Sequence, residues 1–204
     1  MVKFGEEYYL YSKNDNGCDF TVKGDWQQNY AKFVEKHFNE FKSGKTLDFG
    51  CAMGANTSAL KDIGFDITGI DVSEWYVNNS PFENVKLYNY NPNKPDFPFE
   101  DETFDFIHSQ QVIEHMKKSQ INKVLKELNR VLKTDGIIYV ATVEEDEKGI
   151  EKEPTHYSCL SVKDWDKYFK KAGFENITKS YKSIKSDSLP LHYNWVQIIY
   201  KKIK

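Results

Sequence analysis

Apolar residues along the chain follow two alternating spacings, one typical of amphipathic helices and one typical of buried strands. Between Trp26 and Phe41, and again between Ile121 and Leu132, they recur every three to four residues, which predicts helices. Short runs rich in β-branched and aromatic residues separate the helical segments and predict strands. The expected strands are residues 46–49, 65–70, 84–91, 104–108, 137–143, 174–177 and 194–200. This alternation predicts an α/β sheet with helices on both faces.

The last two expected strands are joined by a segment without a helical pattern. A direct connection of this kind joins antiparallel neighbours, whereas parallel neighbours need a crossover helix. We therefore expect a seven-stranded mixed sheet with six parallel strands and one antiparallel strand in an edge hairpin. Residues 1–44 are expected to form an N-terminal arm and a cap helix, and residues 45–204 the sheet domain.

A glycine-containing turn follows the first expected strand. Gly50 and Gly54 allow the backbone to turn sharply and to approach a ligand, which the first amides of the following helix face. About twenty residues later the second strand ends in Asp71, whose carboxylate can accept hydrogen bonds from both hydroxyls of a ribose. The first hypothesis is therefore an adenosine-containing cofactor at the carboxyl end of the sheet.

The spacing of the glycines distinguishes between adenosine cofactors. A dinucleotide-binding G-x-G-x-x-G pattern would need glycines where the chain has Ala52 and Ala55. The stretch from Asp48 to Gly54 instead resembles the first motif of class I S-adenosylmethionine-dependent methyltransferases, with an acidic residue two positions before the first glycine. An acidic strand end suits the cationic ammonium and sulfonium of that cofactor. Ala52 replaces the central glycine that is usual in this family.

A second stretch that resembles the family runs from Phe97 to Met116. It contains Pro-Phe, an acidic turn, Phe-Asp, an apolar strand and a polar segment that ends in Glu-His. The resemblance spans Thr46 to Tyr200 and implies a Rossmann-like fold, a methyltransferase activity and S-adenosyl-L-methionine as the cofactor. The residues that it implies for the cofactor site are Asp48, Gly50, Cys51, Ala52, Gly54, Asp71, Val72, Asn91, Ser109 and Gln110.

Asn91 and Asn89 both stand near the end of the third expected strand, where the family places an Asp or Asn that contacts the adenine. Asn91 matches best, but the inserted Pro95 and Asp96 make the alignment ambiguous by two residues, which leaves Asn89 as the alternative. Either residue is also favoured in a turn by its backbone preferences alone.

Two histidines are candidates for a general base that deprotonates the methyl acceptor. His115 lies just past the expected carboxyl edge of the sheet, and an ordinary imidazole pKa suits this role. His156 follows the acidic loop after the fifth expected strand, in the segment that shapes the acceptor pocket in the family. Structural alternatives exist for both: Glu114 and His115 can satisfy backbone donors at a helix start, and His156 can be an ordinary loop residue. His37 is interpreted as a core residue, and no metal site is predicted.

Composition limits the remaining possibilities. At 204 residues the chain can form one domain with a sizeable core. A formal net charge of −3 offers no overall attraction to nucleic acid. Cys18, Cys51 and Cys159 show no metal-binding spacing, and no apolar run approaches the ~20 residues of a membrane span. We expect a cytoplasmic protein with reduced thiols that is a monomer or a homodimer.

Residues 1–25 are rich in aromatic residues but show no sustained period. They are expected to form an ordered arm, which either packs the next helix onto the sheet or closes over the cofactor and the acceptor. The expected reaction is methyl transfer to a small molecule, because the chain shows neither a clear basic face nor an added recognition domain. The alternatives are a protein or RNA methyltransferase and a non-catalytic module that binds the cofactor.

Overall fold

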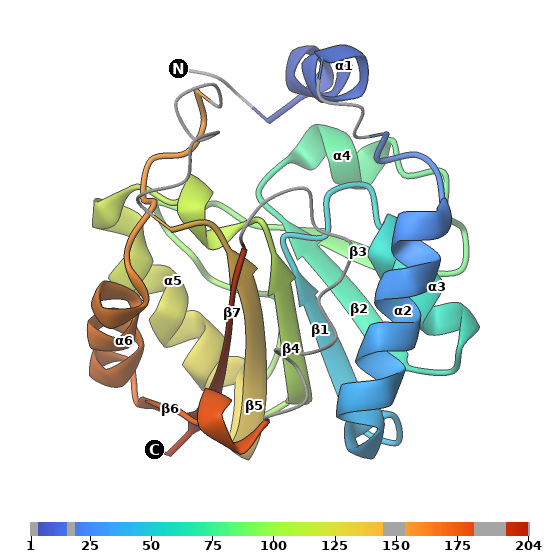
Figure 1. Cartoon of the computed structure of the whole chain (residues 1–204). Helices are drawn as coiled ribbons and strands as arrows, with labels where there is room; N and C mark the ends of the chain where they lie inside the picture. Colours follow the sequence, from blue (N-terminus) through green and yellow to red (C-terminus); the bar gives the residue numbers. More distant parts are fainter. Residues whose placement is uncertain (1–3, 16–18, 145–153, 182–194, 204) are drawn as a thin grey trace.

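The computed structural model describes residues 4–15, 19–144, 154–181 and 195–203, which form one twisted sheet with helices on both faces (Figure 1). Within these residues, seven strands lie in the order β3-β2-β1-β4-β5-β7-β6. Neighbouring strands from β3 to β5 are parallel, and β7 is antiparallel to both β5 and β6. The bounds are β1 Lys45–Phe49, β2 Asp66–Asp71, β3 Lys86–Asn89, β4 Phe104–Gln110, β5 Leu132–Thr142, β6 Phe174–Asn176 and β7 Val196–Lys202. The expected mixed sheet with an antiparallel edge hairpin is confirmed.

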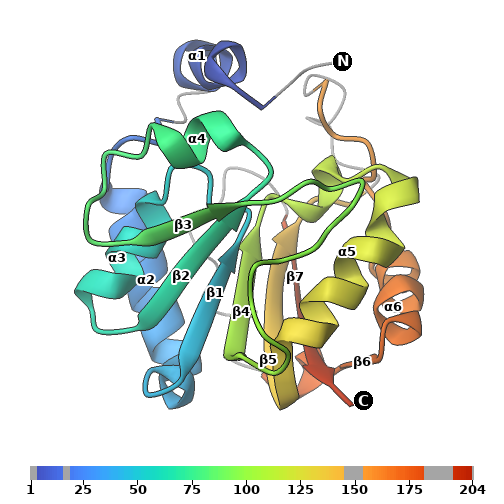
Figure 2. The ribbon, with the colours of Figure 1, turned by 180° about the vertical axis from the view of Figure 1, so that it is seen from behind.

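Helices cover both faces of this sheet. As Figures 1 and 2 show from opposite sides, α2 (Asp25–Phe38) and α3 (Ala55–Asp62) pack on one face, and α5 (Lys118–Val131) and α6 (Val162–Lys171) pack on the other. The remaining helical elements are α1 (Glu6–Asp15), α4 (Glu74–Asn78) and the 3-10 turns η1 (Asn39–Phe41), η2 (Ile113–His115) and η4 (Thr178–Ser180). Among the described residues, no helix has the length and the apolar character that crossing a membrane requires.

Side chains of each strand alternate between the two faces, which divides the core into two clusters. In β4, Phe106 faces α2 and stacks on Phe38, with 4.9 Å between the ring centroids. Its neighbour Ile107 belongs to the opposite cluster, together with Val124 and Leu128 of α5. The central strands are therefore buried on both faces, and even polar residues of β1 and β4, such as Asp48 and His108, are buried.

The carboxyl ends of β1 to β5 meet at one edge of the sheet, because these strands are parallel. Helix α1 lies across this edge beside α4, as both views show (Figures 1 and 2). The ring centroids of Tyr9 and Trp75 are 5.8 Å apart, and the Ser73 hydroxyl donates a hydrogen bond to the Phe4 carbonyl. The irregular apolar pattern of residues 1–25 did not predict this helix, which is held by aromatic contacts with α4 rather than by an apolar stripe of its own.

The expected bounds of two strands were wrong. Strand β3 is shorter than residues 84–91, and β5 begins before residue 137, at Leu132, which pairs with Phe104. Of the last expected strand, residue 194 lies outside the described residues.

The turn between β1 and α3 contains three residues with left-handed backbone conformations: Gly50 (φ 82°), Ala52 (φ 47°) and Gly54 (φ 90°). A Cβ atom on Gly50 would lie 2.1 Å from a methyl carbon of Val112, so that only glycine fits between the turn and the segment after β4. Ala52 adopts a conformation that costs a residue with a side chain about 1–2 kcal/mol. Ala52, which stands at the position of the usual central glycine, is therefore a strained residue in an otherwise regular turn.

Two substitutions in this turn should move the free energy of unfolding in opposite directions. Gly50→Ala adds both the left-handed strain and the overlap with Val112, and we expect a loss of about 2 kcal/mol or more. Ala52→Gly removes strain but makes the unfolded chain more flexible, which leaves a gain of about 0.5–1 kcal/mol. Urea unfolding of both variants measures the two changes. A destabilised Ala52→Gly variant would contradict the assigned strain.

Candidate functional site

The turn after β1, the end of β2 and the end of β4 are tied together by hydrogen bonds. The Gly50 amide donates to the Ile70 carbonyl oxygen at 2.8 Å, which joins the turn to β2. The Asn56 side-chain amide of α3 donates to Gln110 Oε1 at 3.2 Å, which joins the first turn of α3 to the end of β4. These contacts bring the two stretches that carry the expected cofactor residues to the same edge of the sheet.

Asp71 stands at the end of β2 with its carboxylate almost fully buried. Its Oδ2 accepts a hydrogen bond from the Ala52 amide at 2.9 Å, and its Oδ1 accepts one from the Ser73 amide at 2.8 Å. Burial raises the pKa of Asp71 to about 6, although these two amides favour the charged form. A carboxylate can accept about four hydrogen bonds, so that acceptor capacity remains for a ligand.

Asp48, the acidic residue before the first glycine, is engaged inside the protein. Its Oδ2 accepts a hydrogen bond from the Thr57 hydroxyl at 2.6 Å, and its Oδ1 lies 3.6 Å from Nδ1 of His108. The same His108 nitrogen lies 3.0 Å from the Tyr30 hydroxyl. Burial lowers the pKa of His108, which keeps the imidazole neutral. This buried network links α2, β1, β4 and α3, and the sequence pattern alone did not reveal it.

The other residues of the expected cofactor turn lie around Asp71. The Cys51 side chain is buried against Gly69, and burial raises the pKa of its thiol, which keeps it protonated. Gly54 is the N-cap residue of α3, and Val72 is half-buried against the core cluster under α5. Cys51 and Gly54 therefore lie in the turn after β1, and Val72 directly follows Asp71.

The two candidate asparagines differ in position. Asn89 is the last residue of β3, pairs with Asp71 across the sheet and donates a hydrogen bond to the Asp71 carbonyl at 3.1 Å. Asn91 lies beyond the strand, where its Oδ1 accepts a hydrogen bond from the Asn93 amide at 2.9 Å and stabilises the turn. Both side chains are exposed. The choice between them for an adenine contact stays a prediction.

Several buried polar atoms near these strand ends have no hydrogen-bond partner among the described residues. They include Oδ1 of Asn56, Oγ of Ser109 and the Nε2 atoms of Gln110 and Gln111. A buried polar atom without a partner costs about 1–3 kcal/mol. A polar ligand at this edge would supply partners, and the ammonium, carboxylate and hydroxyls of S-adenosylmethionine offer donors and acceptors of the required kinds. The residues therefore fit this cofactor.

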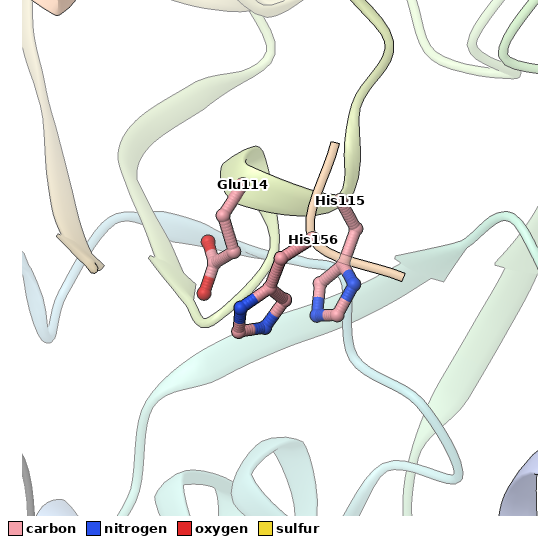
Figure 3. A group of neighbouring side chains, drawn as sticks. All are labelled: Glu114, His115 and His156. Carbon is pink, nitrogen blue, oxygen red and sulfur yellow. The ribbon is translucent and has the colours of Figure 1, made fainter. Parts of the chain in front are cut away.

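Glu114, His115 and His156 form a cluster beside the same edge (Figure 3). Each offers one ligand atom, and the three atoms lie within 4.8 Å of one another. Glu114 and His115 come from η2, directly after β4, and His156 comes from the loop before α6. The Ser158 amide holds this loop against η2 by donating to the Glu114 carbonyl at 2.8 Å. The two histidines that the sequence offered as alternatives are thus neighbours, with ring centroids 4.7 Å apart.

Burial shifts the ionisation of this cluster. Glu114 is fully buried, and its pKa is raised to about 7, because the desolvation of the carboxylate outweighs the hydrogen bond that it accepts from the Thr142 hydroxyl at 2.8 Å. Burial, and then the proximity of His156, lower the pKa of His115 to about 3. The His115 imidazole is therefore neutral at pH 7. Such strong perturbations at the ends of parallel strands are typical of functional sites.

The arm before α2 reaches the cluster. The Phe4 ring meets the His115 ring edge to face, with centroids 5.4 Å apart, and its carbonyl accepts the hydrogen bond from Ser73. The arm therefore contacts the end of β2 and the cluster at the same time. His37, in contrast, is buried on the inner face of α2 beside Phe33, as expected for a core residue.

Comparisons with known proteins agree with this arrangement. Residues 21–179 match the family described as a methyltransferase domain. The chain is 25% identical over 147 residues to a ubiquinone biosynthesis O-methyltransferase of Pelagibacter ubique, a match that covers 68% of this chain and 60% of that protein. It is 32% identical over 136 residues to a demethylmenaquinone methyltransferase of Staphylococcus aureus, over 63% of this chain and 53% of that protein. The chain thus spans between half and two thirds of the length of these relatives.

Solved structures show the same fold. A SAM-dependent methyltransferase from Archaeoglobus fulgidus superposes with a TM-score of 0.71 at 15% identity, over 97% of this chain and 100% of that chain. The family match covers well over half of the chain and includes the cofactor turn, β4 and the Glu-His pair. The chain belongs to the methyltransferase domain family and is a class I S-adenosylmethionine-dependent methyltransferase domain.

Proposed function

We propose that this domain transfers the methyl group of S-adenosylmethionine to an oxygen atom of a small-molecule acceptor. The observation that carries the proposal is the cluster of Glu114, His115 and His156 beside the strand ends that hold the cofactor turn. An acceptor hydroxyl must lose its proton when it is methylated, and this step benefits from a titratable group within hydrogen-bond reach. The cluster brings three such groups together just after the end of β4.

The relatives support a small acceptor. One is named as an O-methyltransferase of ubiquinone biosynthesis, and the other as a demethylmenaquinone methyltransferase. The formal net charge of −3 gives this chain no overall attraction to nucleic acid, which makes RNA a less suitable acceptor. We therefore propose that the acceptor of this chain is also a small molecule, one that carries a hydroxyl group.

When bound, S-adenosylmethionine supplies a methyl group on a positively charged sulfur. We propose that the free acceptor capacity of Asp71 binds the ribose hydroxyls and that Asn89 or Asn91 contacts the adenine. Asp48 acts from within the protein, because it positions α3 and His108 through its buried contacts. The other residues proposed to line the cofactor are Gly50, Cys51, Ala52, Gly54, Val72, Ser109 and Gln110.

The proposed chemistry needs little more than placement. The chain has to hold the acceptor oxygen in line with the methyl carbon and the sulfur, since the donor is already activated. The bond between oxygen and carbon forms while the bond between carbon and sulfur breaks, and the acceptor proton leaves to His156 or to water. His115 is neutral at pH 7, so one of its ring nitrogens can accept a hydrogen bond from the acceptor hydroxyl.

Cofactor binding should weaken in acid, because the ribose hydroxyls need an ionised Asp71. With a pKa of about 6, we expect the Kd of the product S-adenosylhomocysteine to rise about tenfold from pH 7.5 to pH 5. Unfolding caused by Asp71 does not explain such a loss. Because the pKa of Asp71 is raised in the folded state, its protonation favours folding: this contribution to stability is fully present below the ordinary pKa of 3.8 and is lost as the pH rises through about 6. Calorimetric titration at several pH values measures the change.

Asp71→Asn is the matched control, because the amide does not titrate in this range. Its affinity should be lower by about 1.5–3 kcal/mol at pH 7.5 and nearly independent of pH. An equal pH dependence in the variant would show that another group controls binding.

The acceptor side is tested by turnover. His115→Ala should lower the turnover number by about 10²–10⁴-fold, the range for loss of a group that assists proton transfer, and leave the affinity for S-adenosylhomocysteine nearly unchanged. Release of S-adenosylhomocysteine from S-adenosylmethionine, measured over a panel of hydroxylated small molecules, identifies the acceptor and gives the rates. Full activity of both His115→Ala and His156→Ala would rule out the proposed role of the cluster.

A further inference from the structure

We propose that Glu114, His115 and His156 bind a divalent transition-metal cation on the acceptor side of the domain. The cluster combines one carboxylate and two imidazoles from two separate segments, η2 and the loop before α6 (Figure 3). Their three ligand atoms lie within 4.8 Å of one another. Such a set of one carboxylate and two histidines, with open positions left over, is typical of catalytic metal sites.

The required adjustment is small. Ligand bonds of about 2.0–2.2 Å place neighbouring ligand atoms about 3.3 Å apart around a tetrahedral ion. The atoms of the cluster therefore need to approach one another by roughly 1 Å, which small rotations of the two imidazole side chains provide. The side chains already point to the same side, as Figure 3 shows.

The orientation of His115 is fixed by a neighbouring residue, as is usual for metal-binding histidines. Its Nδ1 lies 3.1 Å from the Thr155 carbonyl oxygen and 2.8 Å from the Thr155 hydroxyl. A carbonyl oxygen can only accept, so Nδ1 carries the proton and Nε2 presents its lone pair. A histidine that donates one ring N–H to a carbonyl and offers the other nitrogen is the arrangement that orients a metal ligand.

Glu114 provides the second observation. Its side chain is fully buried, its Oε2 accepts from the Thr142 hydroxyl at 2.8 Å, and its Oε1 has no hydrogen-bond partner among the described residues. Burying a carboxylate oxygen without a partner is costly. A bound cation would compensate that cost and would use the oxygen that Thr142 leaves free.

The ligand set selects the kind of ion. Two imidazoles and one carboxylate suit Zn²⁺, Mn²⁺, Fe²⁺ or Co²⁺, whereas Mg²⁺ and Ca²⁺ prefer sites made of oxygen ligands alone. Three protein ligands leave coordination positions for the acceptor. If the proposed function holds, an oxygen of the acceptor would take one of these positions, where the ion would favour loss of its proton to water before methyl transfer, since His115 and His156 then bind the ion instead of the acceptor. The metal site itself rests on the geometry alone.

Metal binding is tested on the full chain without cofactor or acceptor. After removal of metals with a chelator, CoCl₂ is titrated and followed by calorimetry and by the visible absorption of Co²⁺. We expect one equivalent to bind, and Glu114→Gln and His156→Ala to weaken that binding by at least about tenfold. Glu175→Gln, at an exposed position on β6, is the matched control and should bind as the unmodified chain does.

Three outcomes would overturn the proposal: no binding of Co²⁺, equal binding by the variants, or an absorption band of a thiolate ligand, which would place the ion on a cysteine. If the buried Glu114→Gln variant fails to fold, His156→Ala decides the question. MgCl₂ at the same concentration should raise the melting temperature less than CoCl₂ or ZnCl₂, and an equal or larger rise would reject the choice of a transition metal. Methyl transfer without any bound metal would refute the metal site's role and leave the proposed function standing.

Discussion

The hydrogen bonds between the glycine turn and the end of β2 are the constraint on which the site depends. The Gly50 amide binds the Ile70 carbonyl, and the Ala52 amide binds the Asp71 carboxylate, at 2.8 and 2.9 Å. They hold the turn that follows β1 against the end of β2. The first turn of α3 then faces the end of β4, where Asn56 contacts Gln110. Since β1 to β5 are parallel, the last residues of β4 and β5 lie at the same edge as those of β1 and β2. The site follows from that one geometric arrangement.

The buried carboxylates at this edge differ in how far the protein compensates their burial. Asp48 has Thr57 and the nearby His108. Asp71 has two backbone amides and still keeps a raised pKa. Glu114 has the hydroxyl of Thr142 and one oxygen without a partner in the described part of the chain. The less complete the compensation, the more a ligand can contribute, so Asp71 and Glu114 have more to gain from a bound ligand than Asp48 does.

Most of the fold could be predicted from the sequence, because its signals are local. Gly50 and Gly54 mark a turn between a strand and a helix. A single helical crossover leads from this turn to the next parallel strand, which ends in Asp71, so the topology places the turn and Asp71 at the same edge. The cluster could be predicted only in part. His115 and His156 were treated as alternatives, because a sequence does not show that the loop before α6 folds back onto η2. The Ser158 amide that holds it there lies far from Glu114 along the chain. Helix α1 was missed for a similar reason, since its contacts with α4 are long-range.

The arm makes the two halves of the site depend on each other. Phe4 lies against His115, and its carbonyl is bound by Ser73, whose amide binds Asp71. The Phe4 ring therefore covers one side of His115, while its backbone is tied to Ser73 just after the end of β2. Among the described side chains of α1, Ser12 is buried and Leu10 is 46% exposed, whereas Tyr8, Tyr9 and Tyr11 are half-buried, so that moving this helix would break their aromatic contacts. Contact with both halves of the site is one property that a lid requires, and whether the arm closes over the site or only packs the cap helix stays a prediction.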